Sequence, residues 1–186
     1  DRIHCHTAGS MRFNEDLETL EFYTGNEWKT VNSFKDTGNR GRAIFNAASF
    51  NMTLDFVNIH TLGNARAFGT LSNARASAYG CASETRGVWG GGSEPGYTDV
   101  IDYVTIASEG NAIDFGNLVE ARKELGACSS STRGIWCGGY APGGSRTNTL
   151  QYVEIQTLGN ALDFGDLTTI NVSMAAAASP TRAIFS

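Results

Sequence analysis

The alternation of apolar and polar residues predicts short β-strands that are covered on both faces. In the segment VIDYVTI, Ile101 and Tyr103 lie on one face of an extended chain, and Val104 and Ile106 lie on the other. Apolar side chains on both faces are typical of a strand packed between two neighbouring layers. Comparable segments are LDFVNI at 54–59 and LQYVEI at 150–155. The pattern therefore predicts an all-β protein with stacked sheets.

These segments belong to a repeat. RGVWGGG begins at Arg86 and RGIWCGG at Arg133, and the shorter RAIF begins at Arg42 and again at Arg182. The periods start near these four arginines, with spacings of 44, 47 and 49 residues. A period of about 45–50 residues with four short strands indicates a β-propeller blade of kelch length. We expect kelch-like blades over residues 37–186.

The repeat does not close a ring by itself. It gives three periods and one extra strand, whereas closed propellers use about 4–8 blades. An open ring would leave a sheet face and a strand edge uncovered, which folded proteins avoid. We expect further blades in the same chain, or other chains, to complete the propeller.

Only one connection in the repeat changes length. The spacing from the repeated arginine to the next strand is 12, 15 and 17 residues, while the other spacings are constant. Variable loops on a fixed scaffold are typical of a binding surface, although surface loops also drift without function. The variable connections are Asn46–Thr53, Gly92–Asp99 and Tyr140–Thr149.

These connections contain the candidate binding residues. Their aromatic rings can stack on a sugar or fill a partner's pocket, and their polar groups can supply hydrogen bonds. The candidates are Phe50, Asn51, Glu94, Tyr97, Asp99, Tyr140, Arg146 and Asn148. Replacing the two longer connections by short Gly-Ser segments is expected to leave the melting temperature nearly unchanged.

Two recurrent residue types are expected to be structural. The repeated arginine occupies one position in every period, so we expect it to pair with carboxylates such as Asp114 or Asp163. Cys81 and Cys128 also occupy equivalent positions. Together with Cys137 they are predicted to be reduced packing residues, the alternative being a Cys128–Cys137 bridge across a hairpin.

Composition supports the all-β prediction and excludes some partners. Charged residues make up only 18% of the chain, and it contains 22 glycines and 3 prolines, as expected for many tight turns. A net charge of −5 without a basic run argues against nucleic-acid binding. There is no apolar stretch of membrane-spanning length and no signal-peptide pattern. Because the first residue is Asp, we expect the start to be missing or processed.

The first 36 residues form a separate predicted module. GSMRFNEDLETLEFYTGNEWKTV at residues 9–31 contains three strand-like segments, MRFN, TLEFY and EWKTV, separated by polar turns. The residues Phe13, Leu20, Phe22 and Trp28 are expected to form one small apolar face. That face is too small to stabilise an isolated meander, so it is expected to pack on another chain or domain.

Both parts resemble structural proteins of bacteriophages. GSMRFNEDLETLEFYTGNEWKTV resembles a module of the form G-S-x-R-F-N…L-E-F-Y-x-G-x-x-W found in tail-fibre proteins, and IDYVTIASEGNAIDFGNL with STRGIWCGG resembles kelch-like repeats in virion proteins of marine phages. Standard kelch repeats place a tyrosine and a tryptophan at set distances after the double glycine, which this chain does not. The resemblance implies a virion appendage assembled in the host cytoplasm, with other virion proteins and a host surface glycan or protein as partners. The alternatives are a purely structural assembly module and a cellular kelch-type interaction scaffold.

Catalytic patterns do not stand out in the sequence. There is no nucleophile elbow, phosphate-binding loop or paired-carboxylate constellation, so we expect a non-enzymatic protein without a cofactor. In IHCH, His4 and His6 point to the same side of a strand. By resemblance to phage spikes and fibre tips, three such pairs on a trimer axis would bind iron or zinc. The alternative is an exposed terminus with two incidental histidines.

Overall fold

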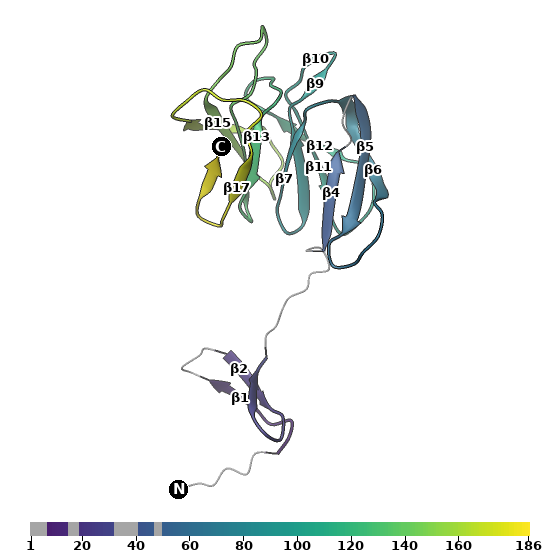
Figure 1. Cartoon of the computed structure of the whole chain (residues 1–186), viewed down its shortest axis with the longest axis vertical. Helices are drawn as coiled ribbons and strands as arrows, with labels where there is room; N and C mark the ends of the chain where they lie inside the picture. The colour runs from purple at the N-terminus through teal and green to yellow at the C-terminus, as the bar shows by residue number, and fades with distance from the viewer. Residues whose placement is uncertain (1–6, 15–18, 32–40, 47–49) are drawn as a thin grey trace. The chain divides into compact units, whose positions relative to one another are not determined.

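The computed structural model describes residues 7–14, 19–31, 41–46 and 50–186. The chain divides into two compact units, Asp1–Asp36 and Thr37–Ser186, which are drawn in Figure 1. Within the described residues every regular element is a strand, which confirms the all-β prediction. No helix in this part of the chain has the length and apolar character that a membrane crossing requires.

The first unit is a three-stranded antiparallel meander in the predicted order. Its strands are β1 (Met11–Asn14), β2 (Thr19–Tyr23) and β3 (Trp28–Thr30). Phe13 pairs with Leu20, so these side chains share a face, whereas Trp28 pairs with Tyr23. Because successive residues of a strand alternate between faces, Trp28 lies on the face opposite Leu20 and Phe22. The prediction of one apolar face with all four residues is therefore wrong for Trp28.

The described residues of the second unit form three sheets and a C-terminal hairpin in chain order, with the same strand order in each complete sheet, and a second short hairpin within residues 93–97. The first sheet is β4-β5-β6, the second β7-β8-β11-β12, the third β13-β14-β15-β16, and the C-terminal hairpin is β17 (Ala176–Ala178) with β18 (Ala183–Phe185). The first sheet comprises β4 (Arg42–Asn46), β5 (Asn51–Asn58) and β6 (Arg66–Arg75). The second comprises β7 (Tyr79–Ala82), β8 (Arg86–Gly90), β11 (Val100–Thr105) and β12 (Ile113–Asn117). The third comprises β13 (Gly126–Ser129), β14 (Arg133–Cys137), β15 (Thr149–Glu154) and β16 (Leu162–Asp166).

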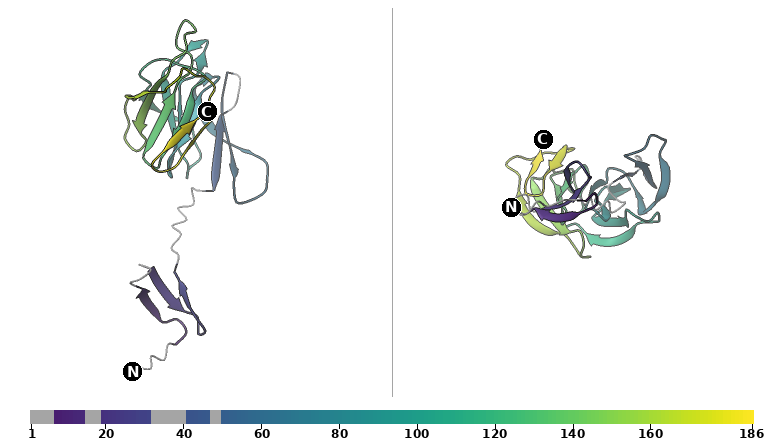
Figure 2. Two further views of the ribbon diagram at one scale, coloured as in Figure 1. Left: turned by 60° about the vertical axis from the view of Figure 1, so that its left-hand side comes forward. Right: turned by 90° about the horizontal axis from the view of Figure 1, so that it is seen from below.

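Successive sheets pack face to face, which places an apolar core between each pair. Trp89 and Val104 of the second sheet pack with Leu54, Phe56, Phe68 and Leu71 of the first. On its other face the second sheet contributes Val88 and Ile101 to a core shared with Trp136 and Val153 of the third. The predicted burial of both faces of β11 is thus confirmed. Figure 2 shows the sheets side by side in chain order.

The glycines of the repeat allow the sheets to approach each other closely. The amide of Gly110 donates to Phe68 O of the preceding sheet at 2.9 Å, and that of Gly159 donates to Phe115 O at 3.0 Å. A Cβ on Gly69 or Gly116 would collide with the backbone of this following turn. The Gly-Asn turn of one sheet therefore docks onto the Phe-Gly pair of the sheet before it.

The repeated arginine also joins neighbouring sheets. Arg42 donates to Ile106 O and Arg86 donates to Ile155 O, both at 2.9 Å. The predicted pairing with Asp114 is wrong, because that carboxylate accepts the amide of Gly116 within its own turn. Asp163 likewise accepts the amide of Gly165. For Arg42 and Arg86 the partner is a carbonyl of the next sheet, which no spacing in the sequence identifies, whereas Arg133 pairs with a carboxylate, that of Glu154, at 2.6 Å.

The cysteines in the described part of the chain are thiols. Cys81, Cys128 and Cys137 form no disulfide, and Cys137 lies opposite Gly126 rather than Cys128. Burial raises the pKa of Cys137 to about 12, and it also raises the pKa of Cys81 and Cys128. Their thiols stay protonated and unreactive at neutral pH, which confirms the prediction of packing residues.

Candidate binding surface

The variable connections share one end of the stacked sheets. Two of them link the second strand of a sheet to the third, and the first links β4 to β5, which are equivalent in the repeat to those strands. Antiparallel strands return all such connections to the same end. Figure 1 shows Gly92–Asp99, with β9 (Ser93–Glu94) and β10 (Gly96–Tyr97), at that end. Residues 47–49 of the first connection lie outside the described residues.

Two of the candidate tyrosines lie close to one lysine. The Lys123 ammonium is 5.3 Å from the centre of the Tyr97 ring and 6.0 Å from that of Tyr140. The Arg146 guanidinium lies 5.5 Å from the centre of the Tyr140 ring. Backbone bridges hold this arrangement, since Tyr140 pairs with both Lys123 and Arg146. Connections from two different sheets therefore form one surface, which we call the tyrosine–lysine surface (Tyr97, Lys123, Tyr140 and Arg146).

Sequence reasoning did not identify Lys123. It lies outside the variable connections, in the constant segment between β12 and β13. The equivalent residues in the neighbouring repeats are Ala76 and Val172. A charged residue at a position that is otherwise apolar in the repeat is the signal that identifies it. The surface combines aromatic faces for stacking with cationic donors for hydroxyl or carboxylate oxygens.

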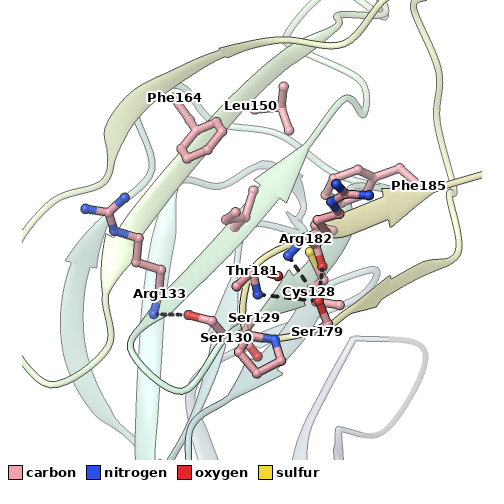
Figure 3. Close-up of a pocket in the computed structure, with 14 residues that line it drawn as sticks. Cys128, Ser129, Ser130, Arg133, Leu150, Phe164, Ser179, Thr181, Arg182 and Phe185 are labelled. Atoms are coloured by element: carbon pink, nitrogen blue, oxygen red, sulfur yellow. Dashed lines mark hydrogen bonds between the residues drawn. The ribbon is translucent and has the colours of Figure 1, made fainter.

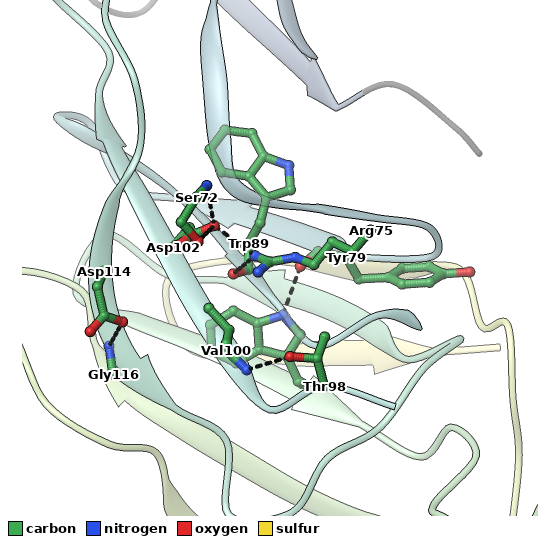
Figure 4. A network of polar contacts seen from close by, with 10 residues as sticks. Ser72, Arg75, Tyr79, Trp89, Thr98, Val100, Asp102, Asp114 and Gly116 are labelled. Carbon is green, nitrogen blue, oxygen red and sulfur yellow. Dashed lines mark hydrogen bonds and ion pairs between the residues drawn. The ribbon is translucent and has the colours of Figure 1, made fainter. Parts of the chain in front are cut away.

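A buried ion pair supports this end of the second sheet. Arg75 and Asp102 are both fully buried, and Arg75 Nη2 lies 3.1 Å from Asp102 Oδ2. The same carboxylate oxygen accepts the amide and hydroxyl of Ser72, and Arg75 also donates to Trp89 O (Figure 4). Burial lowers the pKa of Arg75, and Asp102 and the candidate Glu94 oppose that shift. The pair fixes the strand ends from which Gly92–Asp99 begins.

The equivalent position between the second and third sheets carries a different pair. Gln151 replaces Asp102, and its side-chain oxygen accepts the amide of Val119 at 2.7 Å. Arg122 replaces Arg75 and donates to Gly138 O and Thr149 O, both at 3.4 Å. A buried arginine that donates to backbone carbonyls near a variable connection is therefore common to both interfaces.

The other candidate binding residues lie outside the tyrosine–lysine surface. Phe50 is 59% exposed and has a positive φ of 51°, which is strained for an aromatic residue. The Asn51 side chain accepts the amide and hydroxyl of Thr53. The side-chain amide of Asn148 donates to Leu167 O at 3.1 Å, so it anchors the third connection to the residue that directly follows β16. Asp99, half-buried, accepts the amide of Leu118 through its backbone.

The predicted metal ligands His4 and His6 lie outside the described residues. Among the residues that are described, no group of three or more His, Cys, Asp and Glu side chains is placed to hold a metal ion. His60 is exposed, and its amide is bonded to Asn58 Oδ1.

Two grooves lie between neighbouring elements of the stack rather than on the tyrosine–lysine surface. One, of about 360 Å³, lies between the third sheet and the hairpin, and Arg133, Leu150, Phe164, Arg182 and Phe185 line it (Figure 3). The other, also of about 360 Å³, lies between β4 of the first sheet and β7 and β8 of the second. Both grooves lie between successive elements of the stack, so they belong to the stacking of sheets.

The chain matches no model of a known protein family, and it matches no curated protein.

Proposed function

We propose that this chain is a non-enzymatic structural protein of a bacteriophage virion, of the tail-fibre or appendage class. In this proposal the stacked sheets are kelch-like propeller blades that present their variable connections to a host surface or to another virion protein. Antiparallel four-stranded sheets with one strand order, packed face to face, support the assignment as blades. The resemblance of both parts of the sequence to phage structural proteins supports the class.

The observation that carries the adhesive role is that Lys123 lies close to both Tyr97 and Tyr140. Residues from two sheets converge there, and all three are half-buried, so their positions are held before a ligand arrives. A sugar ring stacked on a tyrosine would place its hydroxyl or carboxylate groups beside Lys123 and Arg146. A bacterial surface polysaccharide is the ligand class that this chemistry fits best.

A purely structural assembly role is the second candidate. It is favoured by the first unit, where Met11, Phe13, Leu20 and Phe22 share an exposed apolar face. Such a face is suited to packing on another chain of the virion. In that case the tyrosine–lysine surface would bind no host polysaccharide.

Binding to immobilised bacterial surface polysaccharides separates the two roles. Tyr97→Ala combined with Tyr140→Ala should weaken binding at least tenfold, and Lys123→Ala should weaken it as well. Leu62→Ala is the matched control, because Leu62 is fully exposed in a turn at the opposite end of its sheet. Peptide mapping of purified virions tests the class itself. Absence of the chain from the particle contradicts the proposal, and equal binding by all variants contradicts the adhesive role.

A further inference from the structure

Two adjacent residues join the variable connections that form the tyrosine–lysine surface. The amide of Arg122 donates to Thr98 O at 3.1 Å, and the carbonyl oxygen of Arg122 accepts the amide of Gly92 at 2.7 Å. The next residue, Lys123, exchanges both backbone hydrogen bonds with Tyr140, at 3.1 and 2.9 Å. Because both connections are bonded to neighbouring residues, the ammonium and the tyrosine rings are held relative to each other without a ligand.

The surface carries two cations that no described carboxylate neutralises. The Lys123 ammonium and the Arg146 guanidinium both lie within 6.0 Å of the centre of the Tyr140 ring. In the part of the chain that the structure describes, no carboxylate lies within ion-pair distance of either group. Other arginines of the second unit do have such partners, namely Arg75 with Asp102, Arg122 with Glu120 and Arg133 with Glu154. The two cations of the surface are therefore left for an external anion.

The carboxylates nearest in sequence act elsewhere. Glu120 is held in an ion pair, Glu124 accepts the hydroxyl of Ser173 at 2.9 Å, and Glu94 acts electrostatically on the buried Arg75. The whole chain carries a net charge of −5, which repels a polyanion at long range. Salt screens that repulsion beyond about 8 Å under physiological conditions. The two nearby cations therefore decide which ligands bind at close range.

This combination of groups fits a sugar that carries a carboxylate on its ring. The planar guanidinium of Arg146 presents two parallel donors to a carboxylate, and the Lys123 ammonium adds a second charge. The tyrosine rings provide faces on which the apolar side of a sugar ring can stack. A neutral sugar would displace water from the two cations without supplying an anion, which costs free energy. A polyanion without rings would leave the aromatic faces uncovered.

We propose that the tyrosine–lysine surface selects acidic polysaccharides, those whose repeating unit contains a uronic or a sialic acid. This inference rests on the proposed adhesive function and narrows its ligand class. The sugar carboxylate binds beside Lys123 and Arg146, and the ring that carries it stacks on the neighbouring tyrosine faces. Lys123 determines the specificity, because its ammonium lies close to both tyrosine rings, 5.3 Å from the centre of Tyr97 and 6.0 Å from that of Tyr140.

Reduction of the ligand tests the proposal without any change to the protein. Polysialic acid, alginate and polygalacturonate are immobilised, each beside the same polymer with its carboxylates reduced to alcohols. The full chain should bind at least one acid form, and reduction of that polymer should weaken binding at least tenfold. Polyglutamate, which has carboxylates but no sugar rings, and the neutral glucan dextran should also bind at least tenfold more weakly. Equal binding to an acid polymer and to its reduced form overturns the inference.

Removal of charge from the surface tests which residues select the carboxylate. Lys123→Gln and Arg146→Gln should each weaken binding of the acid polymer at least fivefold, and so lower its affinity relative to the reduced polymer. Lys123→Arg keeps the charge and should restore most of that preference. Arg66→Gln is the matched control, because it removes the same charge from an exposed arginine at the opposite end of its sheet. A loss of equal size in the control would arise from net charge alone and overturns the inference.

The outcomes separate this inference from the proposed function. Similar binding to neutral and acidic polysaccharides overturns the selectivity and leaves the adhesive role intact. An unchanged acid preference in Lys123→Gln, with binding lost in Tyr97→Ala combined with Tyr140→Ala, does the same. Absence of binding to every polysaccharide, acidic or neutral, contradicts the adhesive role itself and the inference with it.

Discussion

The guanidinium of Arg86 donates a hydrogen bond of 2.9 Å to the carbonyl oxygen of Ile155, across the boundary between the second and third sheets. Within its own sheet it lies 4.6 Å from the centre of the Tyr103 ring. Arg42 makes the same pair of contacts, with Ile106 and Phe56. One side chain thus fixes the position of each sheet on the next.

Arg86→Ala should lower the free energy of unfolding by about 2 kcal/mol, because it removes a charge-assisted hydrogen bond and a cation–π contact together. Arg86→Lys keeps the charge but loses the planar fork, so it should recover only part of the loss. Urea denaturation measures both. Arg66→Ala is the control and should be nearly neutral, because Arg66 is exposed at the start of β6. An equal loss there would contradict this role of Arg86.

Asp102→Ala should be more damaging, at about 3–5 kcal/mol, because it leaves the buried Arg75 without its carboxylate. The double variant Arg75→Met with Asp102→Leu should regain most of that stability, since apolar residues of similar volume need no partner. A double-mutant cycle from urea denaturation tests this. If the double variant is no more stable than Asp102→Ala, the cost arises from packing rather than from an unpaired charge.

The strands and their order could be predicted because the same alternation of apolar residues occurs in each period of the repeat. The hydrogen-bond acceptors of Arg42 and Arg86 could not be predicted, because every residue has a backbone carbonyl and the sequence does not mark out that of Ile106. The face of the sheet on which Trp28 lies depends on the register between two strands, and the sequence of a polar turn does not fix that register. Variation in loop length does not point to Lys123, because its segment has the same length in every repeat.

The variable connections are also more firmly attached than their variation in length implies. The amide of Gly92 donates to Arg122 O, that of Arg122 to Thr98 O, and that of Leu167 to Asn148 O. Replacing whole connections by Gly-Ser segments would remove these bonds together with the candidate side chains. Single substitutions such as Tyr97→Ala therefore test binding more cleanly.

Alkaline pH should destabilise the fold through its buried thiols. Burial raises the pKa of Cys137 to about 12, above its value in the unfolded chain, so the folded state retains a proton that the unfolded state loses. This stability is complete below about pH 8.5 and falls by about 1.4 kcal/mol per pH unit as the pH rises toward 12. Urea denaturation at pH 8, 9 and 10 should show a smaller decline for Cys137→Ala than for the unmodified chain. Val88→Ala, another buried site, should keep the original slope.

Gly69→Ala should destabilise the contact between the first two sheets. A Cβ at residue 69 would collide with the carbonyl of Gly110, so the following turn would have to move and lose its bond to Phe68 O. Overpacking of this kind costs about 1–3 kcal/mol. Gly96→Ala is the matched control, because its Cβ meets only Glu94 O at 3.9 Å, and it should stay within about 0.5 kcal/mol of the unmodified chain. Hydrogen exchange should also quicken at the amides of Gly110 and Ala112, which donate to the first sheet. Unchanged protection in Gly69→Ala would show that the Gly-Asn turn is not held by this contact.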